Sequence, residues 1–307
     1  METIYSFLPK KLTQLLQDLT PEKHESIEEI RIRIDRPVEV SSGRDYMLLP
    51  FIFDEEAAHQ LLNQLTHFSM YTMEEELKRG YITIEGGHRI GLAGKVILDQ
   101  GHVKAIIHIS SFNIRIAKEK IGCADHLIPY LYRNSWQNTM IIGPPQTGKT
   151  TLLRDLARIA SQGLLNPHVP ALKTGIVDER SEITGCVRGV PQLQFGTRVD
   201  VLDACPKAEG MMMLIRSMSP DLIVADEIGR EEDADAVLEA VNAGIHLLIT
   251  LHGSSLEDVM KRPTVKKIIN LNVFNRFVIL GRTFDGMFSY RILDEHGAEV
   301  DGERSVR

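Results

Sequence analysis

One eight-residue segment constrains the fold of this 307-residue chain more than any other, the stretch from 143 to 150. It reads Gly-Pro-Pro-Gln-Thr-Gly-Lys-Thr and matches the phosphate-binding loop pattern G-x-x-x-x-G-K-[ST] at every fixed position. The glycines let backbone N–H groups surround phosphate oxygens, the lysine adds a mobile positive charge, and the last hydroxyl can bind Mg²⁺. The residues predicted to bind nucleotide are Gly143, Pro144, Pro145, Gln146, Thr147, Gly148, Lys149, Thr150 and the following Thr151.

The sequence around this loop predicts a parallel sheet with crossover helices. An apolar strand is expected at 138–142 and a helix at 149–161, whose N-terminus would face the phosphates. Further strands are expected at 173–178, 222–226 and 247–251, with a helix at 233–243 between the last two. The segments 273–280 and 283–293 resemble an edge hairpin, and the polar residues from 294 onward are expected to fray.

Residues 1–120 predict a smaller, mixed α/β domain that precedes this sheet. Helices are expected at 7–19, 54–65 and 69–79, and strands at 26–34, 81–84, 89–98, 103–109 and 111–117. A linker with a short apolar helix is expected at 121–137, and the phosphate-loop domain at 138–307. The predicted fold class is therefore α/β, with a C-terminal RecA-like P-loop domain built on a mainly parallel sheet.

Composition is that of an ordinary soluble globular protein, with 43% hydrophobic and 25% charged residues. A formal net charge of −7 gives no overall attraction for nucleic acid or anionic lipid. Cys123, Cys186 and Cys205 are far apart, which favours reduced thiols over a zinc site or a disulfide. Neither a signal peptide nor an apolar stretch of about 18 residues occurs in the sequence, so we expect no export signal and no membrane span.

Two pairs of carboxylates follow predicted central strands. Asp226 ends the apolar strand at 222–226 and is predicted to support Mg²⁺, while Glu227 is predicted to orient an attacking water. Asp178 and Glu179 end the strand at 173–178 and could assist by polarising water or tuning the metal, because strand ends converge on the ligand crevice of such sheets. In both cases the alternative is a pair of solvated acids.

Histidines and arginines give weaker signals. His252, which shares a strand face with Thr250, is a candidate sensor of the γ-phosphate, and His246 is a weaker candidate that could equally be a core residue. Arg198 and Arg216 are each candidates for an arginine finger that reaches a neighbouring subunit's nucleotide, with an intramolecular ion pair as the alternative. The methionines at 211–213 and 218 are expected in a core or a subunit interface.

Together these motifs resemble the secretion-ATPase superfamily. The shared features are the phosphate loop, an acidic box at 177–183, a Pro-Asp-led strand at 220–227 and a histidine box at 246–252. The resemblance implies an N-terminal domain before a RecA-like ATPase core, with ATP and Mg²⁺ as ligands. Arg-Ile-Gly-Leu-Ala-Gly at 89–94 and Phe-Asn-Ile-Arg-Ile at 112–116 resemble the N-domain segment that lends an arginine to the bound nucleotide, which assigns that role to Arg115.

Several further segments are similar to the stage III sporulation AA family within this superfamily. They include Glu-Glu-Ile-Arg-Ile-Arg near residue 30, Asp-Val-Leu-Asp-Ala-Cys-Pro-Lys and Arg-Ser-Met-Ser-Pro-Asp. That resemblance implies a cytoplasmic mother-cell ATPase that forms a ring of six and associates peripherally with the membrane facing the forespore. The implied partner is a membrane protein of the same sporulation operon, resembling stage III sporulation protein AB, and no nucleic acid is expected.

Two other function classes stay open at this point. A RecA-like ATPase acting on nucleic acid is kept open by Arg31, Arg33, Arg36 and Arg44, although the chain is acidic and shows no basic patch interleaved with aromatics. A nucleotide-gated scaffold that barely hydrolyses ATP would carry the same motifs.

Overall fold

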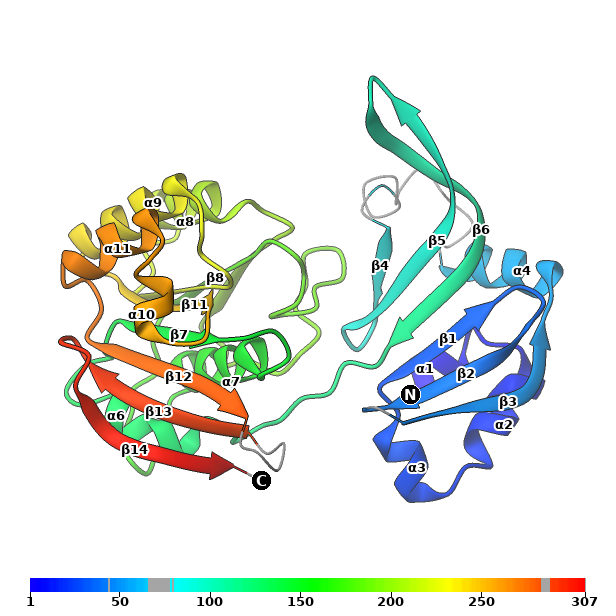
Figure 1. Ribbon diagram of the computed structural model, residues 1–307, viewed down its shortest axis with the longest axis horizontal. Helices are drawn as coiled ribbons and strands as arrows, with labels where there is room; N and C mark the ends of the chain where they lie inside the picture. Colours follow the sequence, from blue (N-terminus) through cyan, green and yellow to red (C-terminus); the bar gives the residue numbers. More distant parts are fainter. Residues whose placement is uncertain (44, 66–77, 79, 283–287, 307) are drawn as a thin grey trace. The chain divides into compact units, whose positions relative to one another are not determined.

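The computed structural model describes residues 1–43, 45–65, 78, 80–282 and 288–306 (Figure 1). The chain divides into two compact units, residues 1–118 with 185–187 and residues 119–184 with 188–307. The helix expected at 69–79 lies, apart from Lys78, outside the described residues.

In the described part of the N-terminal unit, helices α1, α2 and α4 pack on one face of a six-stranded sheet. The sheet has the order β3-β2-β1-β6-β5-β4, with antiparallel pairing throughout. Its strands are β1 (Glu29–Arg33), β2 (Arg36–Ser42), β3 (Asp45–Phe53), β4 (Tyr81–Ile84), β5 (His88–Asp99) and β6 (His102–Arg115), and its helices are α1 (Glu2–Tyr5), α2 (Lys10–Gln17), α3 (Pro21–Ser26) and α4 (Glu55–Leu65). Alternate residues such as Ile30 and Ile32 face these helices and are fully buried, so a single core joins the two layers.

Several expectations for this unit are confirmed and others are corrected. Strand β4 and helix α4 lie where the sequence placed them, and the Asp54 carboxylate accepts the Ala57 N–H at 2.8 Å at the start of α4. The two strands expected at 103–109 and 111–117 are one strand, β6, which continues through Ser110 and ends at Arg115. Strands β2 and β3 were not predicted, since each contains a proline that normally interrupts a strand.

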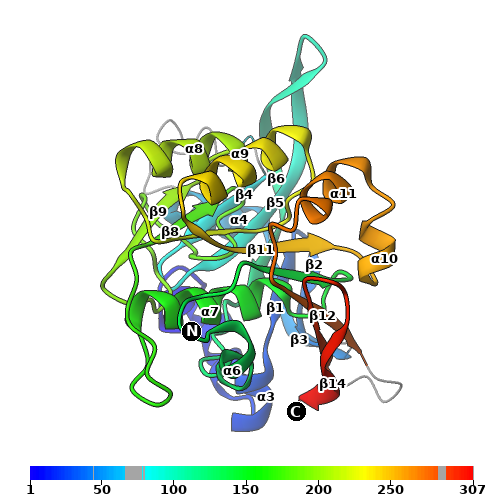
Figure 2. The same ribbon diagram turned by 90° about the vertical axis from the view of Figure 1, so that its left-hand side faces the viewer.

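The second unit contains an eight-stranded sheet with the order β14-β13-β12-β7-β11-β10-β8-β9. Its strands are β7 (Thr139–Gly143), β8 (Thr174–Asp178), β9 (Val199–Asp203), β10 (Leu222–Ala225), β11 (His246–His252), β12 (Arg276–Arg282), β13 (Phe288–Asp294) and β14 (Glu299–Val306). Pairing is parallel from β12 to β9, and β13 and β14 add antiparallel strands beyond β12. Strand β7 therefore lies inside the sheet, between β11 and β12 (Figure 2).

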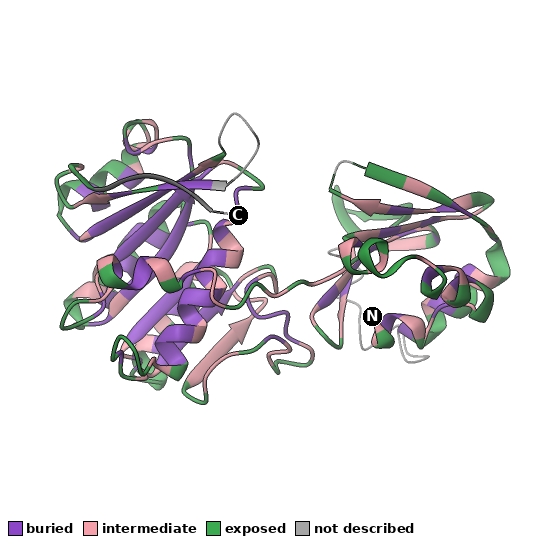
Figure 3. Ribbon diagram, turned by 90° about the horizontal axis from the view of Figure 1, so that it is seen from below, coloured by how far each residue is buried: buried purple, intermediate pink, exposed green. Residues whose placement is uncertain are grey.

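Helices cover both faces of this sheet, as parallel strands require. One face carries η2 (Asp125–Leu127), α6 (Ile128–Leu131) and α7 (Lys149–Gln162), which share a core with Trp136 and Ile141. The other carries α8 (Lys207–Ser217), α9 (Glu231–Asn242), α10 (Leu256–Val259) and α11 (Pro263–Asn270), which pack on Met140 and Ile142. The central strands are consequently buried along their whole length (Figure 3).

Three expectations for this unit are corrected. The segment 121–137, expected as a linker, contributes buried side chains to the core beneath α7, Trp136 among them. The hairpin of β12 and β13 does not form the edge of the sheet, because β14 pairs with β13 and occupies the edge instead. The prediction of a frayed C-terminus is also wrong, because backbone pairing with β13 orders the polar residues of β14, which hydrophobicity alone does not reveal.

Met211 is fully buried in the core against β8, while Met213 and Met218 are exposed. The prediction of a core role therefore holds for the first of these methionines. Within the described residues, no helix is long and apolar enough to cross a bilayer.

Candidate nucleotide-binding site

The phosphate loop connects β7 to α7 inside the second unit. Gly148 is the N-cap of α7 with φ of +84°, a left-handed conformation that favours glycine. A Cβ on Gly143 would lie 2.6 Å from Thr147 Oγ1, so the loop closes tightly over its first glycine. Lys149 Nζ and Thr147 Oγ1 donate to the Pro144 carbonyl at 3.0 and 2.7 Å, which holds both side chains inside the loop. The first N–H groups of α7 are free to bind an anion here.

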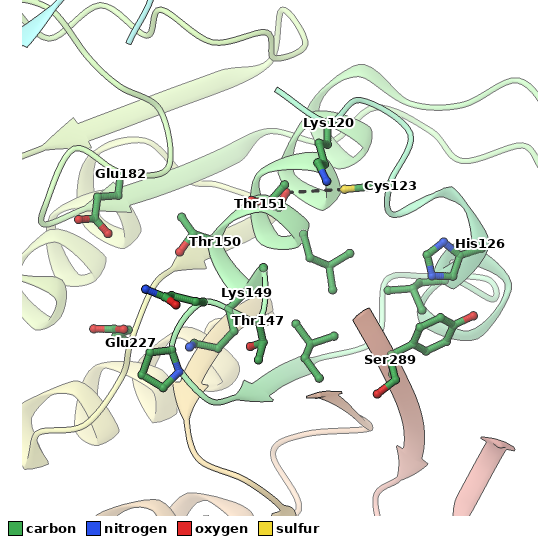
Figure 4. A pocket seen from close by; sticks show the side chains of 17 residues that line it. Lys120, Cys123, His126, Thr147, Lys149, Thr150, Thr151, Glu182, Glu227 and Ser289 are labelled. Carbon is green, nitrogen blue, oxygen red and sulfur yellow. Dashed lines mark hydrogen bonds between the residues drawn. The ribbon is translucent and has the colours of Figure 1, made fainter. Parts of the chain in front are cut away.

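A pocket of about 550 Å³ opens beside this loop (Figure 4). Its size lies within the range of small-molecule sites. Loop residues 145–152 form one wall, Glu182 and Glu227 lie at one end, and Leu280, Ser289 and Tyr290 close the other. The described part of the chain thus places a polar, phosphate-sized end and a more apolar end in one pocket.

The first turn of α7 and the carboxyl ends of β10 and β11 bring an oxygen-rich cluster next to the loop. Thr150 Oγ1 donates to Asp226 Oδ2 at 2.8 Å, although these residues are 76 positions apart. Thr250 Oγ1, from β11, donates to the other Asp226 oxygen and accepts the Glu227 N–H at 2.8 Å. A hydroxyl beside a carboxylate, both oxygen donors, fits a hard cation such as Mg²⁺. The sequence predicted Thr150 and Asp226 for a metal, and the structure brings them together.

Glu227 follows Asp226 and lines the pocket, with φ of +52° and a half-exposed side chain. Non-glycine residues seldom adopt this left-handed conformation, and where they do the cause is often functional. Arg180 Nη1 lies 3.4 Å from Glu227 Oε2, a contact that the sequence alone did not suggest.

The other predicted acids differ from each other in their surroundings. Asp178 is 2% exposed and accepts four hydrogen bonds from residues 182–184, which makes it the anchor of the loop after β8. Glu179 forms an ion pair with Lys207 at the start of α8 and lies near Glu227 around a small cleft. Both residues line that cleft, but Asp178 is buried whereas the Glu179 side chain is 29% exposed.

The candidate histidines lie at opposite ends of β11. His252 is exposed at the carboxyl end, where its Cα is in register with Gly143 at the start of the phosphate loop. His246 begins the strand at the amino end, in register with Leu222, and burial lowers its pKa while Asp221 opposes that effect. Only His252 therefore lies at the edge of the sheet that carries the loop.

Both candidate arginine fingers lie at the amino edge of the parallel strands. Arg198 precedes β9, and its guanidinium donates to the Ala171 carbonyl. Arg216 is exposed in the last turn of α8, which leads back to the start of β10. Neither residue is beside the phosphate loop of its own chain, because that loop lies at the opposite edge of the sheet, at the carboxyl ends of the parallel strands.

Arg115 ends β6 of the N-terminal unit, where its Nε lies 3.3 Å from Glu29 Oε1 and its side chain is 59% exposed. Two of the arginines that kept a nucleic-acid function open are also paired, Arg31 with Glu29 and Arg33 with Glu39, each at 2.8 Å. Arg44 lies outside the described residues.

Sequence patterns missed the apolar end of the pocket. His126 and Tyr290 contact each other with ring centroids 4.7 Å apart, and Cys123 Sγ lies 3.9 Å from the Thr151 carbonyl oxygen (Figure 4). Burial, followed by the charge of Asp155, raises the pKa of the Cys123 thiol to about 12. Arg282, at the end of β12, donates to the Gln146 carbonyl at 2.9 Å. These residues come from segments far apart in the chain and form no local motif.

Comparison with known sequences gives one family for nearly the whole chain. The model of the family described as Sporulation stage III, protein AA matches residues 1–300. The chain is 54% identical over 307 residues to the stage III sporulation protein AA of Bacillus subtilis (strain 168). The match covers 100% of this chain and 99% of that protein.

Solved structures with the same fold include an ATPase and a pilus motor. The Legionella pneumophila ATPase DotB has a TM-score of 0.61 at 16% identity, over 94% of this chain and 81% of that one. The pilus retraction motor PilT with bound ADP has a TM-score of 0.61 at 15% identity, over 89% and 81%. At such low identity the likeness concerns the fold, and it confirms the predicted RecA-like P-loop architecture.

Proposed function

The chain belongs to the sporulation stage III, protein AA family, and on that premise we propose that it is a Mg²⁺-dependent ATPase. The observation that carries the proposal is the meeting of the segments that follow β7 and β10 at one point. The phosphate loop, the Thr150 hydroxyl and the Asp226 carboxylate meet through a 2.8 Å hydrogen bond beside a pocket of about 550 Å³. The reaction is attack of water on the γ-phosphate in line with the leaving group.

Each predicted residue has a role that its position supports. Lys149, a residue that is 7% exposed, binds the β- and γ-phosphates from inside the loop. Thr150 and Asp226 would hold Mg²⁺, which neutralises charge on the phosphate oxygens when bound. Thr250 fixes the Asp226 carboxylate and the backbone of the next residue.

Glu227 is the residue we assign to orient the attacking water, because it follows the metal-binding aspartate and faces the loop across the pocket. Glu179 assists from the neighbouring cleft, and His252 senses the γ-phosphate from the end of β11. Asp178, which the sequence grouped with these residues, supports the site by anchoring the loop that carries Glu182.

The apolar end of the pocket would receive the base and ribose of ATP. Apolar lining surface is supplied by Leu127, Leu280, Tyr290 and Cys123. A flat purine fits such a site because its faces can contact aromatic and aliphatic side chains.

We further propose that the active unit is a homo-oligomeric ring, of six subunits by the family resemblance. Arg198 or Arg216 could complete a neighbour's site, since both lie at the sheet edge away from their own loop. Arg115 of the N-terminal unit would add a further contact to the nucleotide. The ring would work in the mother-cell cytoplasm, docked on a membrane protein of the same operon, to assemble or drive the channel to the forespore.

The decisive test compares two variants of the full chain by ATP binding and turnover. Lys149→Ala should lose tight ATP binding, whereas Glu227→Gln should bind ATP but hydrolyse it at least about tenfold more slowly. Wild-type affinity in the first variant would refute the loop assignment, and normal turnover in the second would transfer the water-orienting role to Glu179.

Turnover measured against protein concentration, with and without single-stranded DNA, tests the assembly. Specific activity that rises steeply with concentration and ignores DNA supports sites completed between subunits. Activity that is independent of concentration and stimulated by DNA would instead support a nucleic-acid ATPase.

A further inference from the structure

Strands β5 and β6 extend beyond the rest of their sheet as a two-stranded ribbon, which we define as residues 95–107 (Figure 1). Strand β4 pairs with β5 only as far as Gly91, and β1 pairs with β6 only from Ser111 onward. Within the described residues, therefore, no neighbouring strand pairs with the ribbon on either side.

The ribbon is apolar and exposed. Val96, Ile97, Leu98 and Val103 are 45%, 40%, 63% and 47% exposed. Cross-strand pairing puts Val96 opposite Ile106 and Ile97 opposite Ala105, so that both faces of the ribbon carry apolar side chains. The ribbon continues a six-stranded sheet, and Ile106 packs against the core of the unit, whereas the apolar residues nearer the turn are exposed and suited to contact with another surface.

A bulge at the base of the ribbon directs it away from the sheet. The register shifts between Ala93 and Lys95, and the opposing His108 has φ of +47°. A Cβ at Gly94 would lie 2.6 Å from the His108 carbonyl oxygen, so the strands can approach here only without a side chain. Bulges of this kind bend a strand pair in a fixed direction, which makes the projection a built feature of the unit.

The same unit has a second exposed apolar surface on strand β3, at the far edge of the sheet. Tyr46, Leu48 and Ile52 are 70%, 57% and 57% exposed and, with the exposed Pro50, point to the face opposite the helices. We call these four residues the β3 stripe. Pro50 lacks an N–H and cannot join a ladder at the edge, so the stripe is suited to contact through its face.

The charged groups around the two surfaces are complementary. Lys95 and Lys104 flank the apolar residues of the ribbon, with Asp99 3.9 Å from Lys104. Exposed acids lie at both ends of the β3 stripe: Asp45 at its start, and Asp54, Glu55 and Glu56 at its end, where Arg36 on β2 adds one positive charge. The stripe therefore favours a basic partner and the ribbon an acidic one.

We propose that the ribbon of one copy packs on the β3 stripe of a second copy. The two surfaces belong to strands at opposite sides of one sheet, so the contact is head-to-tail and each copy can bind one neighbour through each surface. Such a contact closes a ring or extends a filament, and it assigns the N-terminal unit a part in assembly. The contact develops the ring of the proposed function and does not depend on ATP chemistry.

Cysteine cross-linking between differently labelled copies tests this contact. Leu98→Cys and Leu48→Cys variants of the full chain would be mixed and oxidised mildly, and disulfides identified by mass spectrometry. A disulfide between positions 98 and 48 is expected in this mixture. It is not expected in a control mixture of Leu98→Cys with Gln60→Cys, because Gln60 lies on the exposed side of α4. Circular dichroism of each variant verifies that it is folded.

Two additional measurements separate the possible outcomes. In a Lys149→Ala background the cross-link should persist, because the contact does not require ATP binding. This variant therefore tests the contact separately from the proposed ATPase activity. In sedimentation velocity, Lys95→Glu with Lys104→Glu should reduce self-association at least about tenfold, and Glu55→Lys with Glu56→Lys in the partner copy should restore it.

Absence of the cross-link between folded Leu98→Cys and Leu48→Cys variants that still self-associate would overturn the proposal and leave the ATPase assignment intact. Disulfides between two Leu98→Cys copies would overturn it in favour of a symmetric ribbon contact. Flotation of the wild type, but not of Leu98→Asp, with anionic lipid vesicles and without the cross-link would identify a membrane surface as the ribbon's partner, which also overturns it.

Discussion

Replacing Asp178 by alanine should destabilise the second unit by about 3–5 kcal/mol. The carboxylate accepts the N–H groups of Glu182, Ile183 and Thr184 at 2.8, 3.0 and 2.8 Å, and the Thr184 hydroxyl at 2.8 Å. Each hydrogen bond to a charged acceptor contributes about 1.5–3 kcal/mol, and each buried donor left without a partner costs about as much again. Because the four bonds share one side chain and the loop can relax toward water, their sum is an upper limit.

Urea unfolding followed by tryptophan fluorescence measures this change. Trp136 is the single tryptophan of the chain, is 1% exposed and belongs to the same core as Ile183, so its emission reports the unit that contains Asp178. Asp235→Asn is the matched control, since that carboxylate is 64% exposed in its pair with Lys267 and should contribute under about 1 kcal/mol. A loss below about 1 kcal/mol in Asp178→Ala, together with a loss of turnover, would refute the anchoring role and restore the catalytic one.

Three other substitutions or titrations test separate parts of the structure. Thr250→Val removes the hydroxyl that holds Asp226, and should raise the Mg²⁺ concentration for half-maximal turnover severalfold; an unchanged Mg²⁺ titration would contradict this. Gly143→Ala should weaken binding of a fluorescent ATP analogue at least about tenfold, because its Cβ would lie 2.6 Å from Thr147 Oγ1, and equal affinity would show that the loop can adapt. Burial lowers the pKa of His88 from its ordinary value of 6.5 to about 4. As the pH falls from 6.5 to about 4, the unfolded chain takes up a proton that the folded chain excludes, so the free energy of unfolding should decrease across this range and stay level above pH 6.5. Nuclear magnetic resonance of the His88 ring measures this, and a midpoint near 6.5 would contradict the burial argument.

Sequence reasoning succeeded where a short segment carries its own chemistry. The phosphate loop and the Asp226 strand were predicted from local patterns because glycine spacing and an apolar run ending in acid are contiguous features. The meeting of Thr150 with Asp226 also followed, since parallel strands bring their carboxyl ends to one edge of a sheet.

Features that depend on distant partners were not accessible in this way. The sequence grouped Asp178 with the water-orienting acids, because a carboxylate at a strand end looks the same whether it faces a pocket or folds back on its own loop. Arg282 comes from a segment without a motif, and Arg180 lies in the acidic box without a role of its own there. Only the fold brings them near Gln146 and Glu227. Strand β14 was missed because its order comes from pairing with β13, and its sequence is polar.

The interior position of β7 has a consequence for the order in which the molecule is made. As the chain emerges from the ribosome, residues 139–143 appear long before β11 at 246–252 and β12 at 276–282, the two strands that flank them. Closing the long chain segments between these strands costs conformational entropy before the hydrogen bonds of β7 with β11 and β12 can form, and this slows folding. A nascent chain that stops short of β12 would therefore contain the complete phosphate-loop motif with only one of the two strands that flank β7. Nucleotide that binds the finished sheet would stabilise this unit fully only late in synthesis.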